Sequence, residues 1–425
     1  MTMQNRRNFI KVGVAAGANL ALAGCAGMGG TKSTGRLVVV GGGYAGATVA
    51  KYVNLWSGGA IEVTLVERNT KFVSCPISNL VLGGIKGMDD ITHGYDGLAA
   101  RGIRVVYGEV TGIDTDKRSV ALANGESLPY DRLVIAPGVD FMLGSVPGLT
   151  RELSETKFLH AWKAGPQTVA LRKQLEAMPD GGVFAVCIPK APFRCPPGPY
   201  ERACMVAHYF KQQKPKSKVL VLDANPDILS KKGLFLKAWD THYKGIVEYR
   251  KEQVITELDA ASGTVKFQSG SPVKANVLNI IPAQMAGALA KPFVNANGRW
   301  VDVNWLTLET EVAKNVHVIG DATNAAALMP KSGHMANQQA KVAAAAIINL
   351  MSGLEVNAEP VVTNTCYSFV AEKSVVHVSS VHAYNASEKT FETVPGAGGL
   401  SAAANELEAK FAMTWAKNIW ADMLT

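Results

Sequence analysis

A glycine-rich turn directly after a short β-branched run constrains the fold of this chain more than any other feature. The run spans residues 36–40, and a helical pattern over 47–54 follows the turn. Three glycines space the turn: Gly41, Gly43 and Gly46. Residues without a Cβ atom permit a tight turn and close backbone approach, and the helix N-terminus favours a bound pyrophosphate. The pattern predicts a dinucleotide-binding unit, and a glycine turn without a ligand is the alternative.

The second strand of this unit strengthens the prediction. Residues 61–66 form a β-branched run that ends at Glu67, 21 residues after Gly46. An acid at this place binds the ribose hydroxyls of a dinucleotide. The chain has 425 residues, of which 48% are hydrophobic and 18% charged. We therefore expect an α/β protein of two or three domains.

The N-terminus has the pattern of an export signal. Arg6 and Arg7 precede a weakly apolar run over 12–24, and this pair resembles a twin-arginine signal. We therefore expect export to the periplasm. The run ends in Leu-Ala-Gly before Cys25, as in a lipoprotein cleavage box, so Cys25 is a candidate for lipidation; ordinary cleavage nearby is the alternative. No apolar stretch has the ~18 to 20 residues of a membrane-spanning helix, so lipidation is the only membrane contact expected.

Two later segments point to the kind of nucleotide. Residues 130–138, ending in Gly138, resemble the strand and turn that close the first half of FAD-containing oxidoreductases with two dinucleotide folds. Residues 316–322, with Gly320 and Asp321, resemble the second FAD signature of the same proteins. In them the aspartate binds the ribityl chain or the adjacent phosphate. The three motifs, in this order, imply FAD as the resident cofactor.

A second α/β unit begins near residue 150, but its turn does not suit a nucleotide. Residues 189–201 are rich in proline and hold one glycine where a pyrophosphate would need several. Proline removes backbone donors and adds bulk, which disfavours NAD(P). The same turn carries Cys195, and Glu201 follows near the start of a helix. Without further context, Cys195 is a buried cysteine on a stiff turn, and Glu201 a first-turn carboxylate that favours the helix dipole.

Three segments together resemble those of one known protein family. They are residues 194–201, 329–333 and 364–368. From about Gly35 to the C-terminus, the chain resembles the flavoprotein subunit of flavocytochrome c sulfide dehydrogenase. The resemblance implies a redox-active disulfide between Cys195 and Cys366 over the flavin, with Cys366 on the flavin side. It implies that Glu201 takes a proton from sulfide or a thiol.

The resemblance also assigns cofactor contacts. Cys75 matches the family's covalent flavin link, although its neighbours depart from the family's pattern; the alternative is a thiol packed beside the flavin. Lys331, Ser332 and Gly333 open a helix over 335–350 whose N-terminus would face the flavin and stabilise its reduced form.

The fold implied is two dinucleotide-binding domains of the glutathione-reductase type plus a smaller α+β C-terminal domain. The expected segments are a signal and linker (1–34), the first part of the FAD domain (35–149), the second dinucleotide fold with a degenerate NAD site (150–287), the second part of the FAD domain (288–355) and a C-terminal interface domain (356–425). The last helix, over 405–423, either docks a haem subunit or packs on the FAD domain.

The function implied is oxidation of sulfide to zero-valent sulfur or polysulfide. The six cysteines include no C-x-x-C pair, so the chain has no haem attachment motif, and a separate c-type cytochrome is the implied acceptor. The histidines show no metal-ligand spacing, and no basic block with interleaved aromatics points to nucleic acid. The rivals are a sulfide:quinone oxidoreductase and an accessory electron-transfer flavoprotein that does not itself oxidise sulfide.

Overall fold

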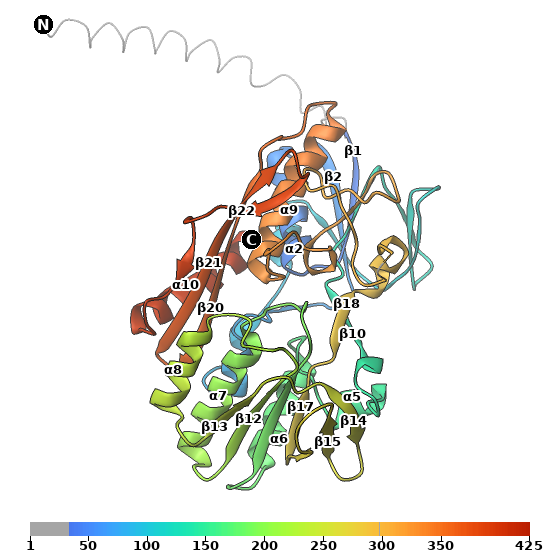
Figure 1. Cartoon of the computed structure of the whole chain (residues 1–425). Helices are drawn as coiled ribbons and strands as arrows, with labels where there is room; N and C mark the ends of the chain where they lie inside the picture. The colour runs from blue at the N-terminus through green and yellow to red at the C-terminus, as the bar shows by residue number, and fades with distance from the viewer. Residues whose placement is uncertain (1–33, 297) are drawn as a thin grey trace, which may run out of the picture.

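A five-stranded parallel sheet forms the centre of the upper lobe in Figure 1. The structure is a computed structural model that describes residues 34–296 and 298–425, so Arg6, Arg7 and Cys25 lie outside the described residues. The strands, in spatial order, are β19 (Val316–Val318), β9 (Arg132–Ile135), β1 (Gly35–Val40), β2 (Ile61–Glu67) and β5 (Arg104–Tyr107). Val40 pairs with both Val66 and Ile135, so the turns after three strands meet at one edge.

Two helices cover this sheet and pack on each other. They are α2 (Tyr44–Trp56) and α9 (Gly333–Met351). The helix predicted over 47–54 is confirmed and begins three residues earlier, directly after Gly43. An antiparallel sheet of β6 (Val110–Asp114), β7 (Ser119–Leu122) and β8 (Ser127–Pro129) leads into β9.

The lower lobe holds a second parallel sheet (Figure 1). Its strands, in spatial order, are β13 (Val247–Arg250), β12 (Lys218–Asp223), β11 (Val183–Ile188) and β17 (Val277–Ile280). Its helices are α6 (Pro166–Ala177), α7 (Gly198–Gln213) and α8 (Lys232–His242). A small antiparallel sheet consists of β14 (Ile255–Asp259), β15 (Thr264–Phe267) and β16 (Val273–Lys274). The two chain crossings between the lobes, β10 (Val139–Met142) and β18 (Ala283–Ala286), pair antiparallel.

The C-terminal part, drawn in red in Figure 1, forms an antiparallel sheet and a last helix. Its elements are β20 (Val361–Ala371), β21 (Ser374–Asn385), β22 (Thr390–Thr393), β23 (Gly399–Leu400) and α10 (Glu406–Leu424). Strand β20 contacts α7 of the lower lobe and α9 of the upper lobe. This placement brings the middle of β20 to the junction of the two lobes.

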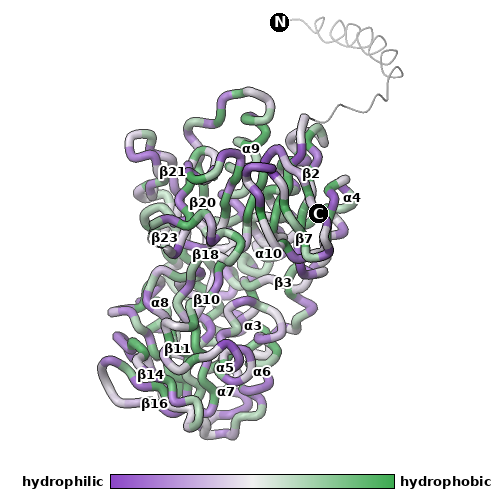
Figure 2. Tube along the Cα trace, turned by 90° about the vertical axis from the view of Figure 1, so that its right-hand side faces the viewer, coloured by the Kyte–Doolittle hydropathy of each residue, from purple (hydrophilic) through white to green (hydrophobic). Residues whose placement is uncertain are grey.

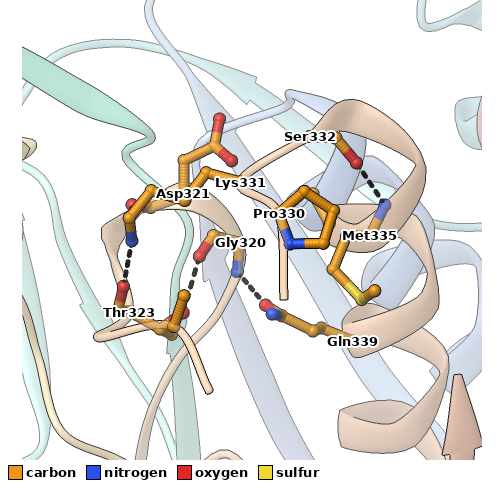
Figure 3. A pocket seen from close by; sticks show the side chains of 10 residues that line it. Gly320, Asp321, Thr323, Pro330, Lys331, Ser332, Met335 and Gln339 are labelled. Atoms are coloured by element: carbon orange, nitrogen blue, oxygen red, sulfur yellow. Dashed lines mark hydrogen bonds between the residues drawn. The ribbon is translucent and has the colours of Figure 1, made fainter. Parts of the chain in front are cut away.

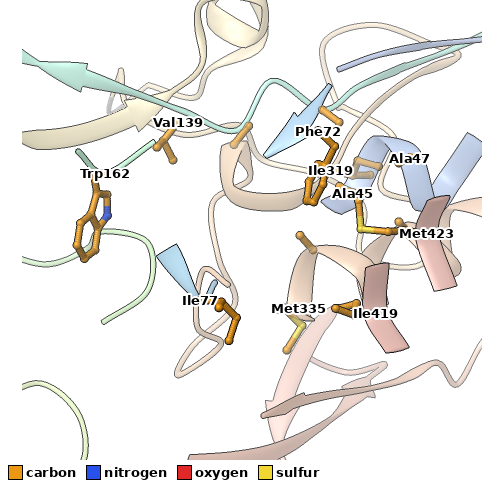
Figure 4. Close-up of a cluster of buried hydrophobic side chains, with 14 of the residues drawn as sticks. Ala45, Ala47, Phe72, Ile77, Val139, Trp162, Ile319, Met335, Ile419 and Met423 are labelled. Atoms are coloured by element: carbon orange, nitrogen blue, oxygen red, sulfur yellow. The ribbon is translucent and has the colours of Figure 1, made fainter. Parts of the chain in front are cut away.

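The last helix is held by the apolar core of the upper lobe. Ile419 and Met423 of α10 lie in one buried cluster with Ala45 of α2 and Met335 of α9 (Figure 4). Trp420 donates a hydrogen bond from Nε1 to the Tyr44 hydroxyl, 3.1 Å away. The packing role expected for this helix is therefore observed.

Short elements connect these parts. They are β3 (Phe72–Val73), α3 (Ser78–Leu82), β4 (Thr92–His93), α4 (Asp96–Ala100) and α5 (Arg151–Thr156). Hydrophobic residues follow the inner strands and hydrophilic residues the outer loops (Figure 2). Within the described part of the chain, no helix is long and apolar enough to cross a membrane.

Candidate active site

The glycine turn after β1 leaves no room for side chains where the chain folds back. A Cβ on Gly46 would lie 1.7 Å from the carbonyl oxygen of Gly41, and Gly41 has a φ of +99°. Gly43 caps α2 and faces open space. Glu67, at the end of β2, accepts a hydrogen bond from the Gly42 amide at 2.7 Å. The turn therefore leaves space for a phosphate group at the N-terminus of α2, and Glu67 lies beside it.

We expect Gly46→Ala to remove the cofactor. The added methyl group must displace the Gly41 backbone, which costs about 3 kcal/mol of stability and deforms the turn that would hold the pyrophosphate. The flavin content of the purified protein measures this loss. Gly144→Ala is the control, because a Cβ there meets nothing within 4 Å. Equal flavin content in both variants would contradict the assignment.

A second part of the site lies between the turn after β19 and the start of α9 (Figure 3). Gly320, with a φ of +76°, and Asp321 form the 3-10 turn η4 (Gly320–Ala322). Lys331 donates from Nζ to the carbonyls of Asp321, 3.1 Å away, and Thr323. Ser332 caps α9 by accepting from the Met335 amide at 3.0 Å. The helix opening predicted at 331–333 is confirmed.

Two other predicted glycines shape the backbone near this region. Gly138 has a φ of +66° and accepts at its carbonyl from the Gly287 amide, 2.9 Å away, where the chain crosses between lobes. A Cβ on Gly333 would lie 3.1 Å from the Tyr44 ring. Glycine at 138 therefore serves the left-handed backbone, since a Cβ there would meet nothing within 4 Å, whereas glycine at 333 permits close approach of α9 to Tyr44.

Cys195 stands on a strained turn directly before α7. Its φ is +54°, in the left-handed region that non-glycine residues rarely adopt. Its amide donates to the carbonyl of Lys331 at 2.7 Å, which ties this turn to the start of α9. A Cβ on Gly198 would lie 3.0 Å from the Cys195 sulfur. The sulfur is therefore fixed at the first residue of α7.

Cys366 reaches the same place from β20. The Asn364 side chain donates from Nδ2 to the Cys366 sulfur at 3.4 Å, and accepts from the Ser332 hydroxyl at 2.6 Å. Burial raises the pKa of both cysteines, and a negative charge on Cys366 raises the pKa of Cys195 further. The structure thus brings the two predicted cysteines together from different lobes. Both are free thiols, so the disulfide remains a prediction.

Glu201 lies in the first turn of α7 and serves the same cluster. Its carboxylate accepts from the Phe369 amide at 2.8 Å and from Asn79 Nδ2 at 2.7 Å. Burial raises its pKa, and these two donors and Lys231 oppose the rise. A carboxyl group with a raised pKa beside two thiols suits proton transfer near neutral pH.

A buried arginine holds the partner of Glu201. Arg202 is 1% exposed and donates from Nε to Asn79 Oδ1 at 3.1 Å. Its other nitrogens bond the Asn279 side chain and the carbonyls of residues 160 and 161. Burial lowers its pKa to about 9. Asn79 is therefore oriented so that its amide nitrogen faces Glu201.

Cys75 lies beside Arg194, the residue directly before Cys195. Arg194 approaches the Cys75 sulfur to 3.1 Å with Nη2 and the Asp321 carboxylate to 4.0 Å with Nη1. The Ala164 amide donates to the same sulfur at 3.4 Å. Arg194 therefore lies between Cys75 and Asp321, next to the turn after β19. The remaining described cysteines, Cys187 and Cys204, are 2% and 0% exposed and serve packing.

The residues present fit a bound FAD. The glycine turn before α2 is open at Gly43, and the N-terminus of α9 opens on the pocket of Figure 3. Gln284 Nε2 and Trp300 Nε1 are among the buried side-chain donors of the described residues that have no hydrogen-bond partner. Gln284 bonds the Arg194 amide through its oxygen, and Trp300 lies under Lys331. A polar group bound here would satisfy both donors.

The turn of the second fold does not fit a dinucleotide. Asp223 ends β12, where a ribose-binding acid would stand, but it is 0% exposed. It accepts from the hydroxyls of Tyr200 at 2.7 Å and Tyr249 at 3.2 Å. This carboxylate is occupied within the protein and is not available to a ribose.

The comparisons with known proteins define the class first. The pyridine nucleotide-disulphide oxidoreductase family model matches residues 35–176. The structure of sulfide:quinone oxidoreductase from Aquifex aeolicus has a TM-score of 0.71 at 18% identity and covers 91% of both chains. Putidaredoxin reductase has a TM-score of 0.66 at 17% identity, covering 92% of this chain and 99% of that one. The fold is that of FAD-dependent oxidoreductases with two dinucleotide folds.

Two more specific models match further segments. The sulfide dehydrogenase [flavocytochrome c] flavoprotein chain, central model matches residues 168–282, and the flavocytochrome c sulphide dehydrogenase, flavin-binding model matches 358–424. The corresponding flavoprotein chain of Chlorobaculum thiosulfatiphilum is 56% identical over 52 residues, which are 12% of this chain and 100% of that sequence. The chain belongs to the family of flavocytochrome c sulfide dehydrogenase flavoprotein chains. Mouse mitochondrial sulfide:quinone oxidoreductase is 24% identical over 324 residues, 70% of this chain and 69% of the relative.

Proposed function

We propose that this protein oxidises sulfide to zero-valent sulfur or polysulfide through a redox-active disulfide between Cys195 and Cys366. One observation carries the proposal. Two cysteines, one on a strained turn of the lower lobe and one on β20, share a half-buried site with Glu201 beside helix α9. The names of the matching family models support sulfide as the substrate.

The chemistry begins at the disulfide. Hydrosulfide attacks the Cys195 sulfur, which forms a persulfide while the bond to Cys366 breaks and Cys366 leaves as a thiolate. Glu201 takes a proton from hydrogen sulfide when the neutral form enters. A second hydrosulfide removes the outer sulfur as hydrogen disulfide and leaves Cys195 as a thiolate. The Cys195 and Cys366 thiolates must then be oxidised back to the disulfide, and FAD, when bound, would supply this two-electron oxidation and could pass the electrons on singly.

We further propose that the electrons go to a c-type cytochrome subunit. The family to which the chain belongs carries flavocytochrome c in its name. The relatives that align over 324 and 346 residues are named sulfide:quinone oxidoreductases, so quinone is the competing acceptor. The test supplies sulfide anaerobically with either a c-type cytochrome or a short-chain quinone. Faster reduction of the cytochrome is expected. Reduction of the quinone alone would establish the quinone reductase, and reduction of neither would favour the accessory flavoprotein.

We also propose that FAD is linked covalently through Cys75. Arg194 and the Ala164 amide both point at this sulfur, which holds the side chain in one place beside Asp321 of the turn after β19. We expect the denatured wild-type protein to retain its flavin fluorescence and denatured Cys75→Ser to lose it. Cys187→Ala, which alters a buried thiol elsewhere, should retain it. Release of all flavin from the denatured wild type would contradict the link and leave Cys75 as a thiol beside the cofactor.

Export to the periplasm through Arg6 and Arg7 remains a prediction, as does lipidation of Cys25. These residues lie outside the described part of the chain. Cell fractionation tests export, and recovery of the protein in the cytoplasmic fraction alone would contradict it. Mass spectrometry of the mature N-terminus tests lipidation.

A further inference from the structure

Lys231 connects the lower lobe to the strand that carries Cys366. It stands between β12 and α8, with a φ of +57°, and is 4% exposed. Its Nζ donates to the carbonyl of Cys366 at 2.9 Å and to the hydroxyl of Ser368 at 2.7 Å. The side chain therefore reaches from the lower lobe to β20 of the C-terminal sheet and ends beside Cys366.

Within the described part of the chain, the Lys231 ammonium donates no hydrogen bond to an anionic group. Both acceptors are neutral, and the Phe235 ring centre lies 5.8 Å from Nζ. A buried charge with neutral acceptors is costly unless a nearby group is, or becomes, negative. The titratable groups that face it are Cys366, Glu201, Cys195 and Glu408. Two of these four are the thiols of the proposed disulfide.

Lys231 and Cys366 affect each other electrostatically. Burial lowers its pKa to about 8, and the charges of Cys366, Glu201 and Cys195 oppose the drop. Burial raises the pKa of Cys366, and the charge of Lys231 opposes that rise, together with the hydrogen bonds from Asn364 and Ser332. The two groups are therefore linked, each favouring the charged form of the other.

We propose that Lys231 is a positioning residue whose buried cation stabilises the Cys366 thiolate when the sulfur pair opens. The inference rests on the proposed function. As the new sulfur–sulfur bond forms at Cys195, the electron pair of the broken bond stays on Cys366. A cation already in place compensates this charge, so the thiolate leaves without taking up a proton. Lys231 acts through its positive electrostatic potential at the Cys366 sulfur. Its hydrogen bond to the Cys366 carbonyl also holds the β20 backbone in place.

The test measures the proton affinity of Cys366 in the holoprotein without using sulfide. The protein is reduced and alkylated with iodoacetamide over a pH series, and the Cys366 peptide is quantified by mass spectrometry. Iodoacetamide reacts with the thiolate, so the rate follows its fraction. In Lys231→Met the midpoint should rise by about one pH unit, which makes alkylation at pH 7 about tenfold slower. Lys231→Arg should keep the wild-type midpoint.

Two further variants make the result decisive. Lys232→Met removes the neighbouring exposed cation, which pairs with Asp227, and should leave the midpoint unchanged. Lys231→Gln keeps a hydrogen-bond donor without charge and should behave like Met, and it replaces Met if that variant does not fold. An unchanged midpoint in the uncharged variants would overturn the proposal. So would an equal shift in Lys231→Arg, because packing would then be the cause.

The sulfide reaction is measured separately on the same variants. A wild-type midpoint in Lys231→Met, with sulfide oxidation dependent on Cys366, would refute the role of Lys231 alone. A shifted midpoint in a protein that does not react with sulfide would refute the proposed function and leave the electrostatic link in place.

Discussion

Replacement of Cys366 by serine should lower the rate of flavin reduction by sulfide at least about 10³-fold. Without this sulfur no disulfide forms, so hydrosulfide has no electrophilic sulfur to attack and the electron pair has no route to the cofactor. Cys195→Ser should have the same effect, because the pair acts as a unit. Stopped-flow absorbance of the flavin under anaerobic conditions measures the rate.

The matched control is Cys187→Ala, which changes a buried thiol on β11 that packs in the lower lobe. It should reduce its flavin at close to the wild-type rate. Flavin content is measured for every variant, so that loss of cofactor is not mistaken for loss of reaction. Wild-type reduction in Cys366→Ser would show that sulfide reacts without the pair.

Glu201→Gln should slow the same reaction by about 10² to 10³-fold, the usual contribution of a positioned base. The amide cannot accept a proton from hydrogen sulfide or from a thiol. It keeps an oxygen for the Phe369 amide, whose bond to Glu201 is 2.8 Å, but loses the bond from Asn79 Nδ2, so the folded state of the variant is checked by its flavin content. Glu311→Gln on the exposed surface is the control.

The pH dependence of the rate is a second test of Glu201 as the base. Burial raises its pKa above the ordinary value of 4.5, so the base is protonated and inactive at the acid end of the range. The wild-type rate should rise with pH as Glu201 ionises above pH 4.5. This rise of the rate with pH should be absent in Glu201→Gln. If the rise persists in the variant, the group that titrates is not Glu201.

Much of the fold follows from local sequence patterns. The turn at Gly41, Gly43 and Gly46 and the acid at Glu67 depend on short-range geometry, and the structure places them together. Helix α9 begins where Ser332 caps it, as the sequence indicates. Such features are predictable because the residues that meet are near in sequence or lie at the ends of paired strands.

The active site is less predictable from the sequence, because its contacts join segments that are distant along the chain. The meeting of Cys195 with Cys366 was implied only by a family resemblance. Lys231, Asn79 and Arg202 were not predicted. Lys231 has no local motif, since it reaches β20 across 135 residues of sequence. Asn79 follows Cys75 closely, but its link to Glu201 depends on how α3 packs on α7.

Arg202 carried one usable signal. It stands directly before the apolar run over 203–207 of the same helix, which indicates a buried charge at this position. Its partners, Asn79 and Asn279, come from other elements and depend on tertiary packing.

The most direct test of the central claim is an anaerobic sulfide titration of the purified protein, followed by the flavin spectrum. The account predicts that sulfide alone bleaches the oxidised flavin of the wild type, in proportion to the sulfide added, before any acceptor is present. A wild-type flavin that stays oxidised in excess sulfide, in protein with full cofactor content, would contradict the claim that this chain oxidises sulfide.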